Sequence, residues 1–248
     1  MISSLFNTFV YTPLYNGLIF LLDVLPFHDL GISVVLLTII VKFILFPLTK
    51  KSIKAQMKMR EIEPELKALQ AKYKDKREVL AMEMMALYRK HNFNPFAGIF
   101  LIFLQIPIIL GLYFVFSGGG FPEVDTEILY SFVSAPETID IMFLSILDIT
   151  GKSIILALLA GITQYIQIKL TLPKLGKREK DATFKDDLMH SMQLQMRYVM
   201  PVIITLIAYH ISAAVALYWV TSNIFTIIQE MFLRKERNMT PVAVEKTN

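Results

Sequence analysis

Long apolar tracts separated by charged segments constrain the fold of this chain more than any other feature. A helix needs roughly 20 mostly apolar residues to cross a hydrocarbon layer of about 30 Å. Four tracts qualify, at residues 31–48, 96–117, 153–170 and 192–233. Only 19% of the residues are charged, whereas a soluble domain has about 25%. The chain is therefore neither a water-soluble globular enzyme nor a disordered tail, and we predict an all-α polytopic membrane protein.

Positive charge is distributed unevenly between these tracts. Residues 50–90 contain twelve Lys and Arg against six acids, whereas residues 118–150 contain six acids and no Lys or Arg. Loops rich in Lys and Arg remain cytoplasmic, so the basic segments are predicted to lie inside and the acidic segments outside. The basic segments are 50–90, 169–197 and 230–248, and the acidic segments are 1–30 and 118–150.

The tract 192–233 is too long for one span and has basic residues on both flanks. It must therefore cross an even number of times, and we place its outer turn near His210 and Ser212. The prediction is a five-span helical bundle with a cytoplasmic C-terminus. The predicted boundaries are span 1 at 31–49, span 2 at 95–117, span 3 at 152–170, span 4 at 192–209 and span 5 at 210–233, with an outer segment at 118–151 and cytoplasmic segments at 50–94, 171–191 and 234–248.

Residues 1–30 have a different pattern. They are apolar between residues 5 and 25, but Asn7, Pro13 and Asn16 interrupt the run. No positively charged region precedes it, which argues against a signal peptide. We predict an extracytoplasmic interfacial helix that leads into span 1, so that the N-terminus lies outside. A sixth span with the N-terminus inside is the alternative.

The basic segment 50–94 is predicted to form a cytoplasmic helical hairpin. Apolar residues recur at helical spacing on both arms, and Tyr73-Lys74-Asp75-Lys76 marks the reversal. These apolar residues are Leu66, Leu69 and Tyr73 on one arm and Leu80, Met84 and Leu87 on the other. Pro64 is expected to interrupt the first arm or to start a new turn.

Lys42 is the only ionisable side chain deep in span 1. A Lys at the centre of a span costs about 2.5–3.5 kcal/mol on insertion scales, and such residues usually mark function. Polar residues of the other spans recur at helical spacing and are expected to form a polar groove around this charge. The candidate groove residues are Thr38, Lys42, Gln105, Gln164, Gln167, Tyr218, Trp219, Ser222 and Asn223.

Structural explanations for the same residues remain open. Polar side chains in membrane helices often join helices and contribute about 0.6 kcal/mol each. Lys42 lies eight residues before Lys50, so its amine can extend to the cytoplasmic surface, or it can pair with Glu230. Tyr218 and Trp219 can be packing aromatics.

The sequence lacks the common catalytic and metal-binding motifs. It has no Cys, no His-Glu-x-x-His, no Gly-x-Ser-x-Gly and no Gly-rich phosphate loop. The span interiors contain no Asp or Glu, which a proton relay would need. We therefore expect no enzyme, no cofactor and no metal site.

Several ordered blocks resemble the YidC-type membrane protein insertase family over about residues 14–234. Each block alone is weak, but the ordered set is specific. The blocks are Leu14-Tyr15-Asn16-Gly17-Leu18, Thr38-Ile39-Ile40-Val41-Lys42, Phe46-Pro47-Leu48, Leu69-Gln70-Ala71-Lys72-Tyr73, Asn94-Pro95-Phe96-Ala97-Gly98, Gln105-Ile106-Pro107-Ile108 and Leu217-Tyr218-Trp219-Val220-Thr221-Ser222-Asn223.

The resemblance implies a hydrophilic groove that is open to cytoplasm and lipid but closed outside. It implies a chaperone and insertase of the bacterial plasma membrane that receives nascent small membrane proteins, alone or with the Sec translocon and the ribosome, without sequence-specific nucleic acid binding. Lys42 stands where the family usually has a groove arginine. Thr38, Gln167 and Trp219 match neighbouring groove positions, and the hairpin at 50–91 matches the family's mobile cytoplasmic hairpin.

Three departures from the family pattern affect these expectations. Lys42 replaces an arginine and loses its proton more readily when buried. The sequence His210-Ile211-Ser212-Ala213-Ala214 stands where the family often has Pro and Gly. The residues after Phe232 are few and only slightly basic, which does not favour a long ribosome-binding tail.

The rival functions are a small-solute channel or transporter, with Lys42 as an anion site, and a non-translocating scaffold.

Overall fold

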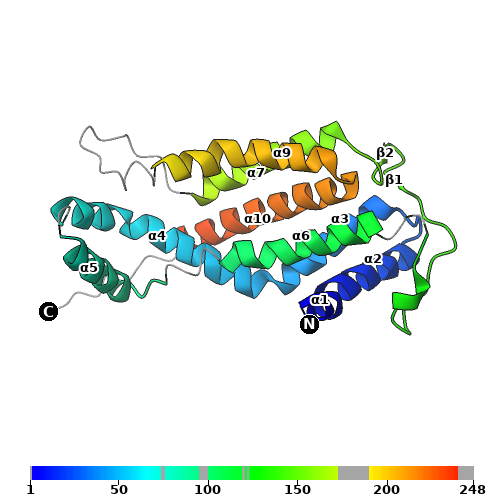
Figure 1. The fold of residues 1–248 in the computed structure, drawn as a ribbon, viewed down its shortest axis with the longest axis horizontal. Coiled ribbons are helices and arrows are strands. Elements are labelled where there is room, and N and C mark those ends of the chain that lie inside the picture. The colour runs from blue at the N-terminus through cyan, green and yellow to red at the C-terminus, as the bar shows by residue number, and fades with distance from the viewer. Residues whose placement is uncertain are drawn as a thin grey trace.

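Helices that run roughly along one direction make up most of the molecule (Figure 1). The computed structural model describes residues 2–73, 76–94, 100–118, 121, 123–172 and 190–239. Its helices are α1 (Ile2–Phe6), the π-helical turn η1 (Asn7–Tyr11), α2 (Thr12–Val24), α3 (Leu30–Ile44), α4 (Phe46–Lys72), α5 (Arg77–Lys90), α6 (Phe100–Gly118), the short 3₁₀ turn η3 (Thr126–Ile128), α7 (Ile154–Thr171), the π-helical turn η4 (Gln195–Val199), α9 (Met200–His210) and α10 (Ala213–Met239). The prediction of a helical membrane protein is confirmed at this level.

Candidate membrane spans can be assigned from length and composition. Two helical segments, Ser4–Val24 and Ile154–Thr171, are long and apolar enough to cross a membrane. A third candidate is the pair α3 and α4 taken together, which is bent by 68°. The segment Ser4–Val24 includes residues for which the sequence predicted an interfacial helix and left a span as the alternative.

The bend between α3 and α4 follows from the local sequence. Asp29 caps the start of α3 because its carboxylate Oδ1 accepts a hydrogen bond from the Ile32 amide at 2.9 Å. The helix ends at Ile44, and α4 starts at Phe46 with Pro47 in its first turn. A proline is tolerated there because first-turn amides have no intrahelical partner. Span 1 was predicted to reach residue 49, whereas the straight part of the helix ends five residues earlier.

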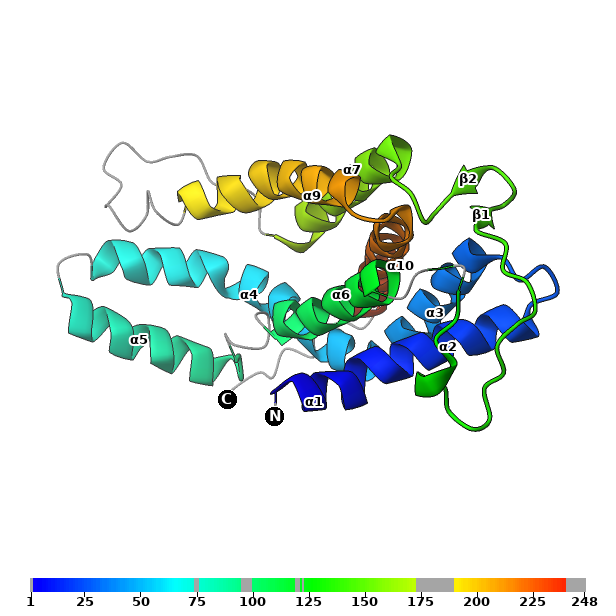
Figure 2. The same cartoon turned by 45° about the vertical axis from the view of Figure 1, so that its right-hand side comes forward.

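The helix α10 occupies the centre of the bundle, beside α7 and α3 (Figures 1 and 2). Its first four residues, Ala213 to Ala216, have no exposed surface. Three of them are alanines, whose small side chains allow neighbouring helices to approach closely. The chain breaks between α9 and α10 at Ile211 and Ser212, next to the predicted turn.

The segment 123–151 contacts the ends of several helices at one end of the molecule. The Asn16 side chain on α2 donates to the Ile128 carbonyl at 2.9 Å and accepts from the Tyr130 amide at 2.6 Å. The strands β1 (Met142–Phe143) and β2 (Leu147–Asp148) form a small antiparallel hairpin in this segment. The amide of Ala214, at the start of α10, donates to the Ile149 carbonyl at 2.8 Å. These bonds tie the segment to both α2 and α10.

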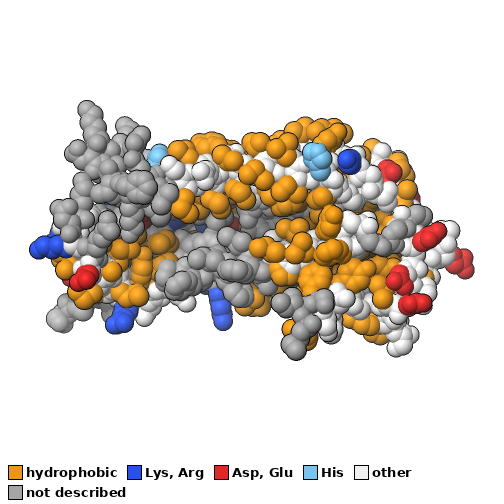
Figure 3. Space-filling view, viewed as in Figure 1, with side chains coloured by type: hydrophobic (Ala, Val, Ile, Leu, Met, Phe, Trp, Pro, Cys, Tyr) orange, Lys and Arg blue, Asp and Glu red, His pale blue; other side chains and the backbone are white. Residues whose placement is uncertain are grey.

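The helices α4 and α5 form a hairpin at the end of the molecule opposite the strands (Figure 2). Pro64 lies inside a continuous α4 and does not break it. Most Lys and Arg visible in Figure 3 lie toward this end, Asp and Glu gather at the opposite end, and hydrophobic side chains cover much of the surface between them. Pro95, most of the predicted loop 171–191 and the end of the predicted tail 234–248 lie outside the described residues.

Candidate functional site

Lys42 is buried in α3 and bonded to α10. The residue is only 9% exposed, and its Nζ donates a hydrogen bond to Thr226 Oγ1 at 3.3 Å. The Thr226 hydroxyl in turn donates to the Ser222 carbonyl at 2.8 Å. The only proton of the Thr226 hydroxyl is used in the bond to Ser222. Its oxygen therefore accepts the hydrogen bond from the ammonium group through a lone pair.

Neither structural explanation offered for Lys42 is seen in the structure. Its amine bonds to Thr226 inside the bundle, and the residue is buried. Glu230, one turn beyond Thr226, accepts instead from the Thr171 hydroxyl at 2.8 Å and from Arg234 at 2.6 Å. Within the described part of the chain, Lys42 forms no ion pair. It is a buried amine whose hydrogen-bond partner among the described residues is neutral.

Gln105 joins α6 to the polar row on α10. Its Nε2 donates to the Tyr218 hydroxyl at 2.6 Å and lies 3.5 Å from Ser222 Oγ. Tyr218 and Ser222 are both buried. The predicted row of Tyr218, Ser222 and Thr226 therefore faces α6 and α3 together, beside Lys42.

Asn223 belongs to the next row of α10 and faces α7. Its Nδ2 donates to Thr163 Oγ1 at 3.1 Å and to the Ala160 carbonyl at 3.4 Å. The Thr163 hydroxyl donates to the Leu159 carbonyl at 2.8 Å. This set of bonds joins two helices, as polar side chains in membrane bundles commonly do.

The remaining candidates have other surroundings. Thr38 is buried, and its hydroxyl donates to the Val34 carbonyl of its own helix at 2.7 Å. Trp219 is buried in the main apolar core. Gln164 and Gln167 on α7 are half-buried. Their amides bond to no other group in the part of the chain that the structure describes, so they can bind water or a ligand.

A cluster at the opposite end of α10 from the strands was not predicted. Arg60 on α4 donates through one terminal nitrogen to the carbonyls of Leu170 and Leu172, the latter at 2.7 Å. Arg234 donates to the Leu170 carbonyl and to Glu230. We call Arg60, Thr171, Glu230 and Arg234 the arginine clamp. The spacing of Glu230 and Arg234 is visible in the sequence, but bonds to a distant backbone are not.

These contacts define what the site can do chemically. It offers one ammonium group, several hydroxyls and amides, and, among the described residues, no carboxylate bonded to them. Among the described residues, no group of three or more His, Cys, Asp or Glu side chains could hold a metal ion. The arrangement is suited to attracting an anionic group and to hydrogen bonding with polar chain segments.

Comparison with known proteins gives consistent matches along the chain. Residues 23–240 match the family model described as 60Kd inner membrane protein. A protein named membrane protein insertase YidC from Fusobacterium nucleatum is 29% identical over 231 residues, covering 92% of this chain and 98% of the relative. One of the same name from Clostridium tetani is 32% identical over 211 residues, covering 85% and 84%.

Some relatives are much longer than this chain. A membrane protein insertase YidC from Syntrophobacter fumaroxidans is 32% identical over 211 residues, covering 84% of this chain. The match covers only 35% of that relative. The chain therefore spans about a third of the length of this protein, but nearly all of the Fusobacterium relative.

Proposed function

The chain belongs to the 60Kd inner membrane protein family, and we propose that it is a membrane protein insertase, as its relatives named YidC are. Its clients would be nascent small membrane proteins, and the protein would be embedded in the lipid bilayer. We place it in the bacterial plasma membrane as a multi-pass protein, with the C-terminus in the cytoplasm and the N-terminus outside. It would act alone or beside the Sec translocon and the ribosome.

The proposed topology has five spans, formed by α3, α6, α7, α9 and α10. The acidic segment 118–151 would lie outside and the hairpin at 50–94 inside, as the distribution of Lys and Arg favours. Residues 1–30 would enter from the outer interface. The length of the apolar helix Ser4–Val24 also supports the alternative in which it is a sixth span.

The observation that carries the proposal is the buried, unpaired ammonium group of Lys42. An ion inside a protein is costly unless it is paired or hydrated, and Thr226 supplies only a neutral oxygen. The cost is explained if the charge acts on an arriving anionic group. At an effective dielectric constant near 20, a contact ion pair contributes of the order of 4 kcal/mol, enough to favour an acidic client flank.

The other candidate residues would line a hydrated groove next to Lys42. Gln105, Tyr218 and Ser222 offer polar atoms on one side, and the amides of Gln164 and Gln167, which bond to no other described group, would offer them on the other. Thr38, Trp219 and Asn223 would support the walls. A polar flank that enters this groove has less hydrocarbon left to cross.

The client's apolar segment would then move into lipid between the helices. Burial of apolar surface supplies about 25 cal/mol per Å², so the release step needs neither a nucleotide nor a bond-making reaction.

The alternative functions are a small-solute channel and a scaffold. The names of the relatives favour the insertase.

The proposal is tested by reconstituting the purified chain into lipid vesicles. A small single-span client with an acidic flank should become protease-protected in these vesicles and not in empty ones. Equal protection in both would contradict insertase activity. Solute flux through vesicles that contain the protein but no client would indicate a channel instead.

Groove hydration has its own test, because the chain contains no native Cys. Gln164→Cys should react with a membrane-impermeant thiol reagent from the cytoplasmic side only. Ile162→Cys, two residues away on α7 and 54% exposed on an apolar surface, should face lipid and not react. Reaction of Gln164→Cys from the outer side would contradict a groove closed on that side.

A further inference from the structure

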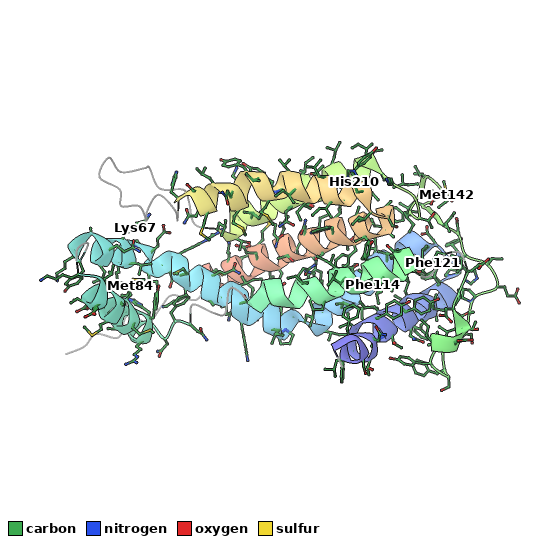
Figure 4. The ribbon with its side chains drawn as sticks, viewed as in Figure 1. Lys67, Met84, Phe114, Phe121, Met142 and His210 are labelled. Atoms are coloured by element: carbon green, nitrogen blue, oxygen red, sulfur yellow. The ribbon has the colours of Figure 1, made fainter. Side chains whose placement is uncertain are left out.

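The β-hairpin of β1 and β2 ends in an apolar turn. We call its three turn residues, Leu144, Ser145 and Ile146, the β-hairpin tip. Leu144 and Ile146 are 56% and 79% exposed. The β-hairpin lies at the end of the molecule where α3 begins, and Met142 marks its first strand in Figure 4. Turns that face water consist mostly of Gly, Pro, Asn, Asp and Ser, so these exposed apolar side chains need another explanation.

The backbone of the tip is strained at its apolar residue. Leu144 and Ser145 have φ angles of 54° and 59°, and the Ile146 amide donates to the Phe143 carbonyl at 3.1 Å. The two residues are therefore the central positions of a tight turn, where Gly and Asn are favoured because other side chains are strained at positive φ. A leucine is destabilising there within the protein, which is explained if its side chain makes a favourable contact outside it.

The amides of the tip are all bonded inside the protein. The Leu144 amide donates to Asp29 Oδ2 at 2.8 Å. The amides of Ser145 and Ile146 donate to the two carbonyls of β1, at 3.0 and 3.1 Å. A backbone amide that enters an apolar layer without a partner is strongly destabilising. The tip can therefore leave water without exposing an unpaired amide to hydrocarbon.

The rest of the β-hairpin is fixed on the first turn of α3. A Cβ at Gly31 would collide with the Phe143 ring, so the ring lies directly on the helix backbone. The Leu30 amide donates to the Asp140 carbonyl at 2.9 Å, and the Asp140 amide donates to the His28 carbonyl at 3.0 Å. The tip is thus presented from a packed base.

The position of α7 indicates the level of the tip relative to the membrane. This helix has 18 residues and is a candidate span, and at 1.5 Å per residue it is about 27 Å long, close to the thickness of the hydrocarbon layer. Only a short loop separates the end of β2 at Asp148 from Ser153, which caps α7. Ile154 and Ile155, in the first turn of α7, are exposed. The β-hairpin is therefore joined to α7 where the hydrocarbon layer would end.

Polar groups are concentrated away from the tip. The Asp148 carboxylate, at the end of β2, accepts hydrogen bonds from the amide and the hydroxyl of Thr150 at 2.8 and 2.7 Å. Lys152 is exposed in the loop that follows. An apolar tip with a charged base is the distribution typical of a segment that lies in a membrane interface.

We propose that the β-hairpin tip inserts into the membrane interface and anchors the end of the bundle where α3 begins. Leu144 and Ile146 lie among the lipid chains, and Asp148 and Lys152 lie at the level of the headgroups. The partner is the lipid bilayer, because the tip is joined to the exposed apolar surface of a membrane-spanning helix. The proposal requires that α7 spans the membrane and does not depend on the proposed insertase function.

Spin-label accessibility tests the depth of the tip, using the full chain at one copy per lipid nanodisc. The chain has no native Cys, so Ser145→Cys and Ile146→Cys each carry a single nitroxide. Collisions are measured with oxygen, which concentrates in hydrocarbon, and with a nickel chelate, which remains in water. Both labels should favour oxygen and report a depth of about 5–10 Å into the boundary between headgroups and acyl chains.

Two other labelled positions calibrate this result. Glu137→Cys is the matched control, because Glu137 is exposed in the same segment, and its label should favour the nickel chelate. Ile162→Cys on α7 supplies the reference for a label deep in lipid. Tip labels that are as accessible to nickel as the label at Glu137→Cys would overturn the proposal. Tip labels that neither reagent reaches would overturn it too, because they would be covered by protein.

The apolar side chains have a separate test. Leu144→Asn with Ile146→Asn keeps the turn, because Asn tolerates positive φ, and the label at Ser145→Cys should then move toward nickel. Leu144→Met with Ile146→Val keeps the tip apolar and should leave the label at its original depth. An unchanged depth in the asparagine variant would overturn the proposal. Neither measurement requires a client, so failure of the insertase proposal would not affect the result.

Discussion

Lys42 Nζ on α3 lies 3.3 Å from Thr226 Oγ1 on α10, two residues that are 184 positions apart in the chain. The Thr226 proton is directed to the Ser222 carbonyl, so the hydroxyl oxygen acts as the acceptor. The bond occupies one of the three N–H groups of the ammonium. The other two can bind water or a client.

Thr226→Val removes this acceptor while keeping the side-chain volume. We expect insertion of an acidic-flank client to fall by up to about tenfold, the equivalent of 1.4 kcal/mol, because a hydrogen bond to a charged group contributes about 1.5–3 kcal/mol. Thr226→Ser keeps the oxygen and should retain most of the activity. Insertion rates in reconstituted vesicles measure both, and equal losses in the two variants would argue against the hydrogen bond.

Asp29→Ala should destabilise the end of the bundle where α3 begins. One carboxylate oxygen of Asp29 caps α3 and the other accepts from the Leu144 amide at 2.8 Å. Loss of the cap costs about 0.5–2 kcal/mol, and the unpaired Leu144 amide adds about 1–3 kcal/mol. Thermal unfolding in detergent measures the change, with the exposed Asp23→Ala as the control. Equal stability of the two variants would contradict this role of Asp29.

The coarse fold and part of the site were predictable from the sequence. Long apolar tracts are enough to indicate a helical membrane protein, because the hydrocarbon layer fixes the length of a span. The spacing of Tyr218, Ser222 and Thr226 indicated one face of a helix, and all three hydroxyls lie on the side facing α6 and α3. Helical periodicity identified the face without identifying its partners.

Gly161→Ala should weaken the contact between α7 and α9. A Cβ at this position would collide with the Thr205 side chain and lie 3.0 Å from the Pro201 carbonyl oxygen. Overpacking of this kind typically costs about 1–3 kcal/mol.

The double variant Gly161→Ala with Thr205→Ala tests the cause. It should recover part of the lost stability, because the Thr205 hydroxyl is removed while the Pro201 carbonyl remains. The four proteins of this cycle can be compared by thermal unfolding in one detergent. Strictly additive losses would indicate that the two residues do not interact.

Acidification should loosen the pairing between α4 and α5. Hydrogen bonds from His91 and then Lys90 hold the pKa of Glu65 below its ordinary value. A lowered pKa in the folded protein means that the contact stabilises the hairpin above the pKa of a free glutamate, about 4.3. This contribution is lost as the pH falls through the lowered value.

Amide hydrogen exchange in α5 can follow this loss. After correction for the intrinsic rate, protection should decrease below about pH 4.3 in the parent protein. In Glu65→Gln the protection should already be low at pH 6 and should change little on acidification. Identical pH profiles for the two proteins would contradict a role for Glu65.

The tertiary bonds that join distant segments could not be predicted from the sequence. Arg60 binds backbone carbonyls 110 and 112 residues away, and carbonyls carry no sequence signal. Asp29 has the ordinary pattern of a helix cap, but its second oxygen binds Leu144, 115 residues away. The alternative partner considered for Lys42, Glu230, is occupied by Arg234, which lies at the i+4 spacing that favours ion pairs within a helix.

The proposed mechanism depends on the positive charge of Lys42. Comparing the insertion of two clients that differ in the charge of one flank tests this dependence most directly. The two single-span clients are identical except that one has an acidic flank and the other a neutral flank. Their insertion is measured in vesicles that contain the parent protein or one of the variants Lys42→Ala, Lys42→Glu and Lys42→Arg. The exposed Lys54→Ala is the control. We predict that Lys42→Ala and Lys42→Glu slow the acidic client selectively, that Lys42→Arg is tolerated and that Lys54→Ala has no effect. Full insertion of the acidic client by Lys42→Glu would contradict the account.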